Sequence, residues 1–139
     1  MSWPRTFLRD KSGASAVEFA LILPVLALIL IGVGEIGHVI YQRTDMHGAL
    51  RTGGQYVLNG GRDLATAREL VLRSWNSAPD DREVEALRFC LCQEVEHACS
   101  APCDDNSIPE AYVRLTARAT LGGVLVEFGE SADDSIRIR

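Results

Sequence analysis

The sequence lacks the residue combinations with which most enzymes carry out their chemistry. It has only three histidines among 139 residues, and none stands at a recognised motif spacing from a serine or cysteine nucleophile. Its paired glycines are not followed by the lysine and serine or threonine of a phosphate-binding loop. The Asp-Asp-Asn stretch at 104–106 has no glutamate at the distance that a calcium loop requires. We therefore predict no enzymatic activity, no catalytic residue, no cofactor and no metal ion.

The sequence also lacks an excess of positive charge. Outside its first 13 residues it holds 11 basic and 18 acidic residues, a net charge of −7, which argues against nucleic-acid binding. The first 13 residues hold three basic residues against Asp10, a net charge of +2. Because basic residues favour the cytoplasmic side of a membrane segment, residues 1–13 are predicted to be a cytoplasmic leader, with the C-terminal part outside.

Charge is absent from the 16 residues between Phe19 and Gly34, and the apolar stretch continues to Tyr41 if Glu35 is allowed. This is about the 20 residues that a helix needs to cross a bilayer, so a transmembrane helix is predicted over about 19–41. A cleaved secretory signal fits less well, because its apolar part is shorter and would not open with the carboxylate of Glu18. That carboxylate lies either at the headgroup level, where its charge costs little free energy, or within lipid, where a charge requires a binding partner or a functional role.

The start of the apolar stretch has the spacing of a known processing site. A basic leader ends in Gly13, Ala14 follows, and Glu18-Phe19 stand just before the apolar run. This arrangement resembles the type IV pilin class, and within it the TadE-like minor pseudopilins of the tight-adherence (Tad, or Flp) pilus. The resemblance implies cleavage by a prepilin peptidase between Gly13 and Ala14. It also implies that Glu18 and Phe19 serve subunit assembly.

Two helices are predicted from apolar periodicity. Beyond the membrane segment a helical stripe continues until Asn59-Gly60-Gly61, which predicts one long helix over 14–59, apolar in its first half and amphipathic in its second. Asp63 is a suitable cap for a second helix. The apolar stripe of that helix consists of Leu64, Ala67, Val71 and Trp75.

Residues 60–139 are predicted to form an α+β head outside the cytoplasm. From Glu83 the apolar period changes to two, and the alternation returns at 112–121, as expected for strands. Extended chain is predicted to resume around 124–128, and a short terminal strand is predicted at 135–139. The predicted fold class is α+β: a long N-terminal helix, a second helix, and a small antiparallel sheet that rests on helices and is stapled by disulfides.

Four cysteines fall within 14 residues, as Cys90-x-Cys92 and Cys99-x3-Cys103. They could bind one zinc ion, or form two disulfides. We favour disulfides, because the predicted topology places these residues in an oxidising compartment and a domain this small needs covalent cross-links for stability. Of the three possible connectivities, Cys92–Cys99 nested inside Cys90–Cys103 is the easiest geometrically. The pairing of Cys90 with Cys99 and of Cys92 with Cys103 remains open.

The cysteine cluster and the later strands also resemble the TadE-like proteins. The resemblance implies a minor pilin or pseudopilin, a structural or assembly-initiating subunit of a bacterial pilus involved in cell adhesion. Such a protein spans the bacterial inner membrane once, with its N-terminus cytoplasmic and its C-terminus periplasmic, and can enter the extracellular pilus. The implied partners are other pilins and pseudopilins, the prepilin peptidase, the inner-membrane assembly platform and membrane lipid, but not nucleic acid.

Two other functions are compatible with parts of the sequence. One is an unprocessed single-span membrane anchor that carries a periplasmic binding domain. The other is a metal-binding or redox module built on the four cysteines. The mature N-terminus distinguishes the first from a pilin, and the state of the thiols tests the second.

Overall fold

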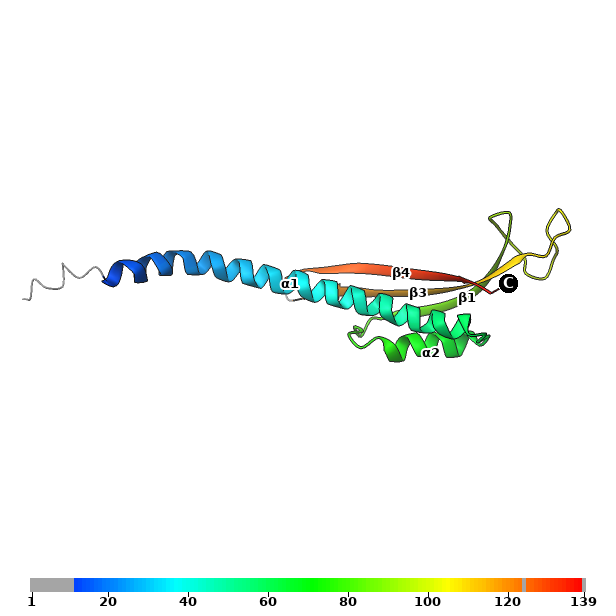
Figure 1. Cartoon of the computed structure of the whole chain (residues 1–139), viewed down its shortest axis with the longest axis horizontal. Coiled ribbons are helices and arrows are strands. Elements are labelled where there is room, and N and C mark those ends of the chain that lie inside the picture. The colour runs from blue at the N-terminus through cyan, green and yellow to red at the C-terminus, as the bar shows by residue number, and fades with distance from the viewer. Residues whose placement is uncertain (1–11, 124, 139) are drawn as a thin grey trace, which may run out of the picture. The chain divides into compact units, whose positions relative to one another are not determined.

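The computed structural model describes residues 12–123 and 125–138 (Figure 1). Two helices precede four strands: α1 (Ser12–Leu58), α2 (Leu64–Ser74), β1 (Glu83–Cys92), β2 (Val95–His97), β3 (Glu110–Gly122) and β4 (Glu127–Arg137). The predicted α+β class is confirmed: a long N-terminal apolar helix, a second helix, an antiparallel sheet and two disulfides are all present. The chain divides after Gly37 into an N-terminal unit and a C-terminal unit.

Helix α1 ends at the Asn59-Gly60-Gly61 stretch, where the sequence predicts its end. Gly60 has a φ of 90°, a left-handed conformation that glycine adopts without the steric penalty of a Cβ. The amide of Gly61 donates to the carbonyl of Tyr56 and the amide of Gly60 to that of Val57, both at 3.0 Å. This pair of bonds satisfies two carbonyls at the end of the helix, as in a Schellman motif.

Helix α2 begins behind the predicted cap. The carboxylate of Asp63 accepts hydrogen bonds from the amides of Ala65 and Thr66 at 3.2 and 3.0 Å. Hydrogen bonds from the side chain and amide of Thr66, and then from the amide of Ala65, lower the pKa of Asp63. The predicted apolar stripe faces inward, with Ala67 and Val71 fully buried.

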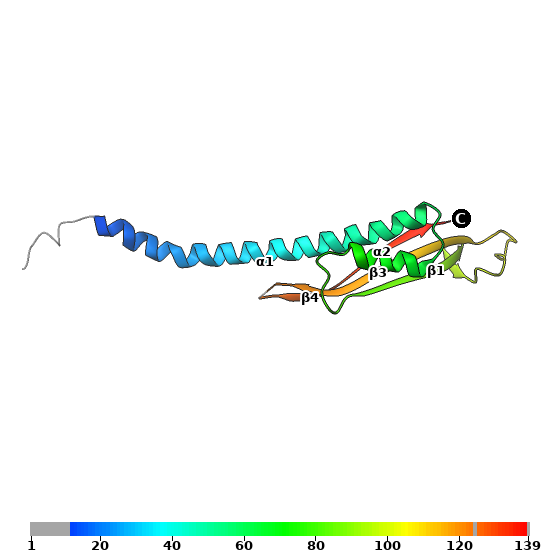
Figure 2. The ribbon, with the colours of Figure 1, turned by 90° about the horizontal axis from the view of Figure 1, so that it is seen from below.

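The four strands form one sheet in the order β2-β1-β3-β4, and every neighbouring pair is antiparallel. Burial along β3 alternates strictly over most of its 13 residues, as expected for a strand covered on one face. The second half of α1 and helix α2 lie on that face (Figure 2). Between them is one core, whose largest fully buried side chains include Met46, Leu50, Val71, Val113, Leu115 and Leu121.

Two parts of the sheet differ from the prediction. Residues Val95–His97 form strand β2, which the sequence analysis did not predict. The predicted short strand at 135–139 is instead the end of the single strand β4, which pairs with β3 along its whole length from Glu127 to Arg137. The sequence obscures β4 because its middle contains Gly129, Asp133 and Asp134, residues that are rare in strands.

Gly53 tests how closely α1 and the sheet pack. A Cβ at this position would lie 2.5 Å from Val71 Cγ2 and 2.9 Å from Leu115 Cδ1, two side chains that are fully buried and cannot move aside. We expect Gly53→Ala to lower the free energy of unfolding by about 1–3 kcal/mol, the usual cost of overpacking a core. Denaturant unfolding of the detergent-solubilised chain, followed by circular dichroism, measures this change.

Gly48 in the same helix provides the matched control. Nothing lies within 4 Å of a Cβ at this position. Gly48→Ala should therefore stabilise the chain by about 0.5–1 kcal/mol through helix propensity alone. Equal effects of the two substitutions would contradict close packing at Gly53.

Candidate functional site

The predicted cleavage bond, between Gly13 and Ala14, lies in the first turn of α1, which begins at Ser12. Residues 1–11 of the predicted leader lie outside the described part of the chain. Gly13 is exposed, and nothing lies within 4 Å of a Cβ built on it. Backbone amides in the first turn of a helix have no partner within the helix, so this turn is held less firmly than those that follow.

Glu18 and Phe19 follow one turn later on α1. Glu18 is four residues from Ala14, so the two backbone positions lie one above the other on the same side of the helix. Both Glu18 and Phe19 are exposed, Phe19 to 60 %. No hydrogen bond or ion pair joins Glu18 to another described residue. The structure thus places Glu18 and the predicted cleavage bond close together along one helix.

No part of the chain that the structure describes covers the apolar part of α1. Helix α1 is the one described helix long and apolar enough to cross a membrane, and none of its most apolar segment is buried. Leu21 and Leu28 are 73 % and 70 % exposed. Gly32, Gly34 and Gly37 also have open space where a side chain would stand. Exposed apolar surface of this extent requires lipid or other helices to cover it.

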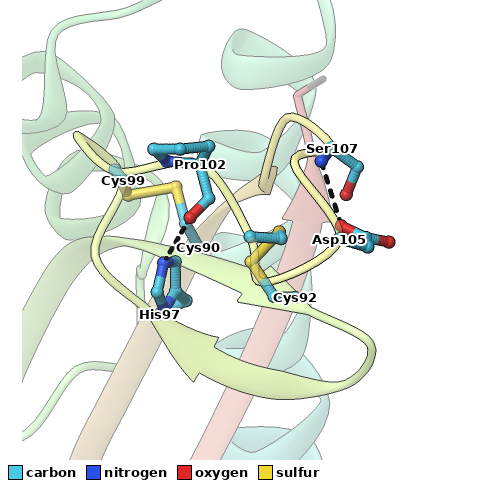
Figure 3. The surroundings of a disulfide bond; sticks show 8 residues. Cys90, Cys92, His97, Cys99, Pro102, Asp105 and Ser107 are labelled. Carbon is cyan, nitrogen blue, oxygen red and sulfur yellow. Dashed lines mark hydrogen bonds between the residues drawn. A yellow bond between two sulfur atoms is a disulfide. The ribbon is translucent and has the colours of Figure 1, made fainter.

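The four cysteines form two disulfides at the end of the sheet where β1 meets β2 (Figure 3). Cys90 pairs with Cys99 and Cys92 with Cys103, with Cα–Cα distances of 5.2 and 5.6 Å. The nested connectivity favoured by the sequence analysis is therefore wrong, and the pairing that it left open is present. Because all four sulfurs are in disulfides, none is present as the free thiolate that a zinc site requires.

The turn between β1 and β2 explains this connectivity. Gln93 and Glu94 both have positive φ, 51° and 70°, as in the two-residue turns that join tight hairpins. The turn sets Cys92 opposite Val95 and Cys90 opposite His97. Cys99, two residues beyond His97, is therefore carried past Cys92 to the level of Cys90. Only after four more residues does the chain return close enough for Cys103 to reach Cys92.

Hydrogen bonds order the loop that follows β2. Ring nitrogen Nε2 of His97 lies 3.0 Å from the carbonyl oxygen of Pro102, and the amide of Ser107 donates to Asp105 at 3.0 Å (Figure 3). Hydrogen bonds from the side chain and then the backbone of Ser107 hold the pKa of Asp105 below its usual range. Among the described residues, no group of three or more His, Cys, Asp or Glu side chains could hold a metal ion.

The outer face of the sheet carries a cluster that the sequence analysis did not identify. The rings of Phe89 and Tyr112 stack with centroids 5.4 Å apart, and the guanidinium of Arg114 lies 4.3 Å from the centre of the Phe89 ring. The hydroxyl of Tyr112 donates to Glu110 at 2.8 Å, which raises the pKa of Tyr112. Period-two alternation separates Phe89 from the buried Val84 and Cys90 of β1, but its cross-strand pairing with Tyr112 could not be known without the register.

Removing a disulfide tests both its energetic role and the connectivity. We expect replacement of Cys90 and Cys99 together by Ser to lower the free energy of unfolding by about 2–3 kcal/mol, because the unfolded chain regains the freedom of a short loop. The remaining two cysteines should stay oxidised, so titration of the purified chain should find no free thiol. The matched control replaces Cys90 and Cys103, which leaves the two unpaired partners. If this control were fully oxidised and the first variant reduced, the nested connectivity would be correct.

Comparison with known proteins matches one part of this chain. The model of the TadE-like protein family matches residues 13–55, which begin at the predicted cleavage site and cover most of α1. No curated protein and no solved structure matches the chain. The matched segment contains Glu18, Phe19, the whole apolar stretch and the part of α1 that packs on the sheet up to Gly54. The match shows that this segment, less than half of the chain, is similar to TadE-like proteins.

Proposed function

We propose that this chain is a minor pilin or pseudopilin of a bacterial tight-adherence pilus, matured by a prepilin peptidase that cuts after Gly13. The observation that carries the proposal is the coincidence of three features within residues 13–55. These are the spacing from Gly13 to Glu18-Phe19, the uncovered apolar helix, and the match to the TadE-like family. The chain would act as a structural or assembly-initiating subunit, and not as an enzyme.

The uncovered apolar helix supports a membrane location. About 20 residues between Phe19 and Tyr41 are suited to lipid, and the basic leader favours a cytoplasmic N-terminus. The C-terminal unit would then lie in the periplasm, an oxidising compartment in which the two disulfides are stable. Its partners would be the prepilin peptidase, the inner-membrane assembly platform and other pilins.

Cleavage would create the charge that Glu18 is placed to neutralise. The new N-terminus on Ala14 is a positively charged amine, which is costly to remove from water without a partner. Opposite charges about 4 Å apart attract by about 4 kcal/mol at an effective dielectric constant of about 20. Within one chain Glu18 is one helical turn from the Ala14 amine. In an assembly, the Glu18 of a neighbouring subunit could neutralise that amine instead. Such an exchange would set the stagger between subunits.

The small residues on the apolar helix support close packing in that assembly. Gly32, Gly34 and Gly37 leave their surroundings open in the single chain. In an apolar environment, small residues let helix backbones approach closely and gain van der Waals contact. Neighbouring pilin helices would therefore replace lipid around this part of α1 when the subunit enters a fibre.

The mature N-terminus tests processing directly. N-terminal sequencing of the membrane-extracted protein, from cells with and without the prepilin peptidase, should give Ala14 only where the peptidase is present. A start at Met1 or Ser2 in both strains would indicate an unprocessed membrane anchor. A start beyond Gly34 would indicate a secretory signal. Either of these two results would overturn the proposal.

A substitution at Glu18 tests assembly separately from insertion. We expect Glu18→Ala to insert into the membrane and to be cleaved normally, but to enter the pilus fraction much less than the unmodified protein. Quantitative immunoblots of membrane and sheared pilus fractions measure this. Val17→Ala, which shortens the neighbouring exposed side chain without changing charge, is the matched control and should assemble normally. Normal incorporation of Glu18→Ala would refute the assembly role of this carboxylate.

A further inference from the structure

The hairpin between β3 and β4 has an unusual tip, defined here by its described residues, Gly123 and 125–128. Turns that join strands are commonly built from glycine, asparagine, aspartate and proline, whereas this one reads Gly-Val-Leu-Val-Glu-Phe. Leu125 is 68 % exposed, Val126 46 % and Phe128 49 %. Val124 lies outside the described residues. Three apolar side chains are thus gathered and uncovered at one end of the sheet.

Backbone contacts join the two strands at the base of the hairpin tip. Gly122 pairs with Glu127 at the end of the ladder, and the amide of Gly123 donates to the carbonyl of Val126 at 3.1 Å. A Cβ on Gly122 would lie 2.5 Å from that same carbonyl oxygen, so only glycine allows the chain to reverse so tightly here. Gly123 and Val126 are therefore held together at the base of the tip, next to the exposed side chains of Leu125 and Phe128.

Two polar contacts tie this end of the sheet to α1. The amide of Gly122 donates to Oε1 of Gln42 at 2.9 Å, and Nε of Arg43 lies 2.9 Å from Oε1 of Glu130. The Arg43 side chain is 61 % exposed, so its ion pair adds little stability, but it helps to fix position. All four residues belong to the C-terminal unit.

Within the C-terminal unit, the direction of β3 carries the tip toward the beginning of the unit's part of α1, near Tyr41 and Gln42. Near the other end of the sheet, Gly54 of α1 packs against Ile136, which is paired with Val113 of β3. Gly122, at the end of β3, contacts Gln42. Strand β3 therefore runs antiparallel to α1, and its later residues lie beside earlier residues of the helix. The hairpin tip lies beyond Gly122, on the side where α1 continues to Tyr41, the last residue of the apolar stretch.

We propose that the hairpin tip is a second membrane contact, which inserts Leu125, Val126 and Phe128 among the lipid headgroups and upper acyl chains. This inference rests on the proposed function, because it requires that α1 cross the bilayer up to about Tyr41. Gln42 would then stand in the interfacial zone, which is about 5–8 Å deep on each side of the hydrocarbon core. Tyr41, at the same level, is a typical interfacial residue.

The charges at the tip specify how it meets the membrane. Its one charged residue is Glu127, and Glu130 nearby is engaged by Arg43. Attraction between basic residues and anionic headgroups is therefore not available, and the contact depends on apolar burial. The tip would hold the C-terminal unit against the membrane surface until the subunit is drawn into a fibre.

Spin labels on the full-length chain in lipid nanodiscs test the proposal. Leu125→Cys and, in a separate variant, Ile108→Cys each add one thiol for a nitroxide, after thiol titration has shown that both disulfides are intact. Ile108 is the matched control, because it is 73 % exposed and precedes β3 at the end away from the tip. A third label at Leu28→Cys reports whether α1 itself is in lipid.

The measured quantity is the relaxation enhancement of each nitroxide. It is compared for oxygen, which is concentrated in lipid, and for a water-soluble nickel chelate, and is reported as the ratio of the two. We expect a ratio at residue 125 several-fold above that at residue 108, with little change on adding salt. Equal ratios at 125 and 108, with residue 28 in lipid, would overturn the tip contact and leave the proposed function standing. Low access of both reagents at residue 125 would mean that protein covers the tip, and would also overturn it. Water access at residue 28 would overturn the proposed function and this inference with it.

Discussion

The packing of α1 against β3 is the interaction on which the C-terminal unit depends. Met46, Leu50 and Val57 are spaced by four and seven residues, so they lie on one side of the helix, and all three are buried against the sheet. Burying a side chain of this size contributes about 1.5–3 kcal/mol. Gly53 lies within the same stripe and brings the helix backbone close to Leu115. Without this helix, only α2 would remain on the inward face of the sheet, and much of that face would be open to water.

The two ends of the sheet are held together in different ways. Around Cys90 and Cys92 the strands extend past the end of the helix, which terminates at Leu58, and long loops replace packed elements. Two disulfides hold this end together where little apolar surface is available. At the opposite end, beyond Gly122, the chain turns within four residues and needs no covalent link. The polar, cross-linked end suits solvent, and the apolar turn suits a surface that excludes water.

The sequence predicts much of this fold because its strongest patterns are local. The glycines after Asn59 and the cap at Asp63 determine where the helices end and begin, and period-two alternation identifies β1 and β3. Strand β2 and the disulfide pairing were missed because they depend on Gln93 and Glu94 adopting positive φ, which neither residue type favours. The uncovered apolar helix was foreseeable, whereas the position of the hairpin tip beside Gln42 depends on long-range register.

A short polar segment separates the part of α1 that is suited to lipid from the part that packs on the sheet. Gln42, Arg43 and Asp45 each bind a different element: the end of β3, strand β4, and the backbone and side chain of Ser77 after α2. The core stripe begins only at Met46. These three polar contacts and the core stripe therefore all lie past the apolar stretch. If lipid around that stretch were exchanged for the helices of neighbouring subunits, the fold of the C-terminal unit would not need to change.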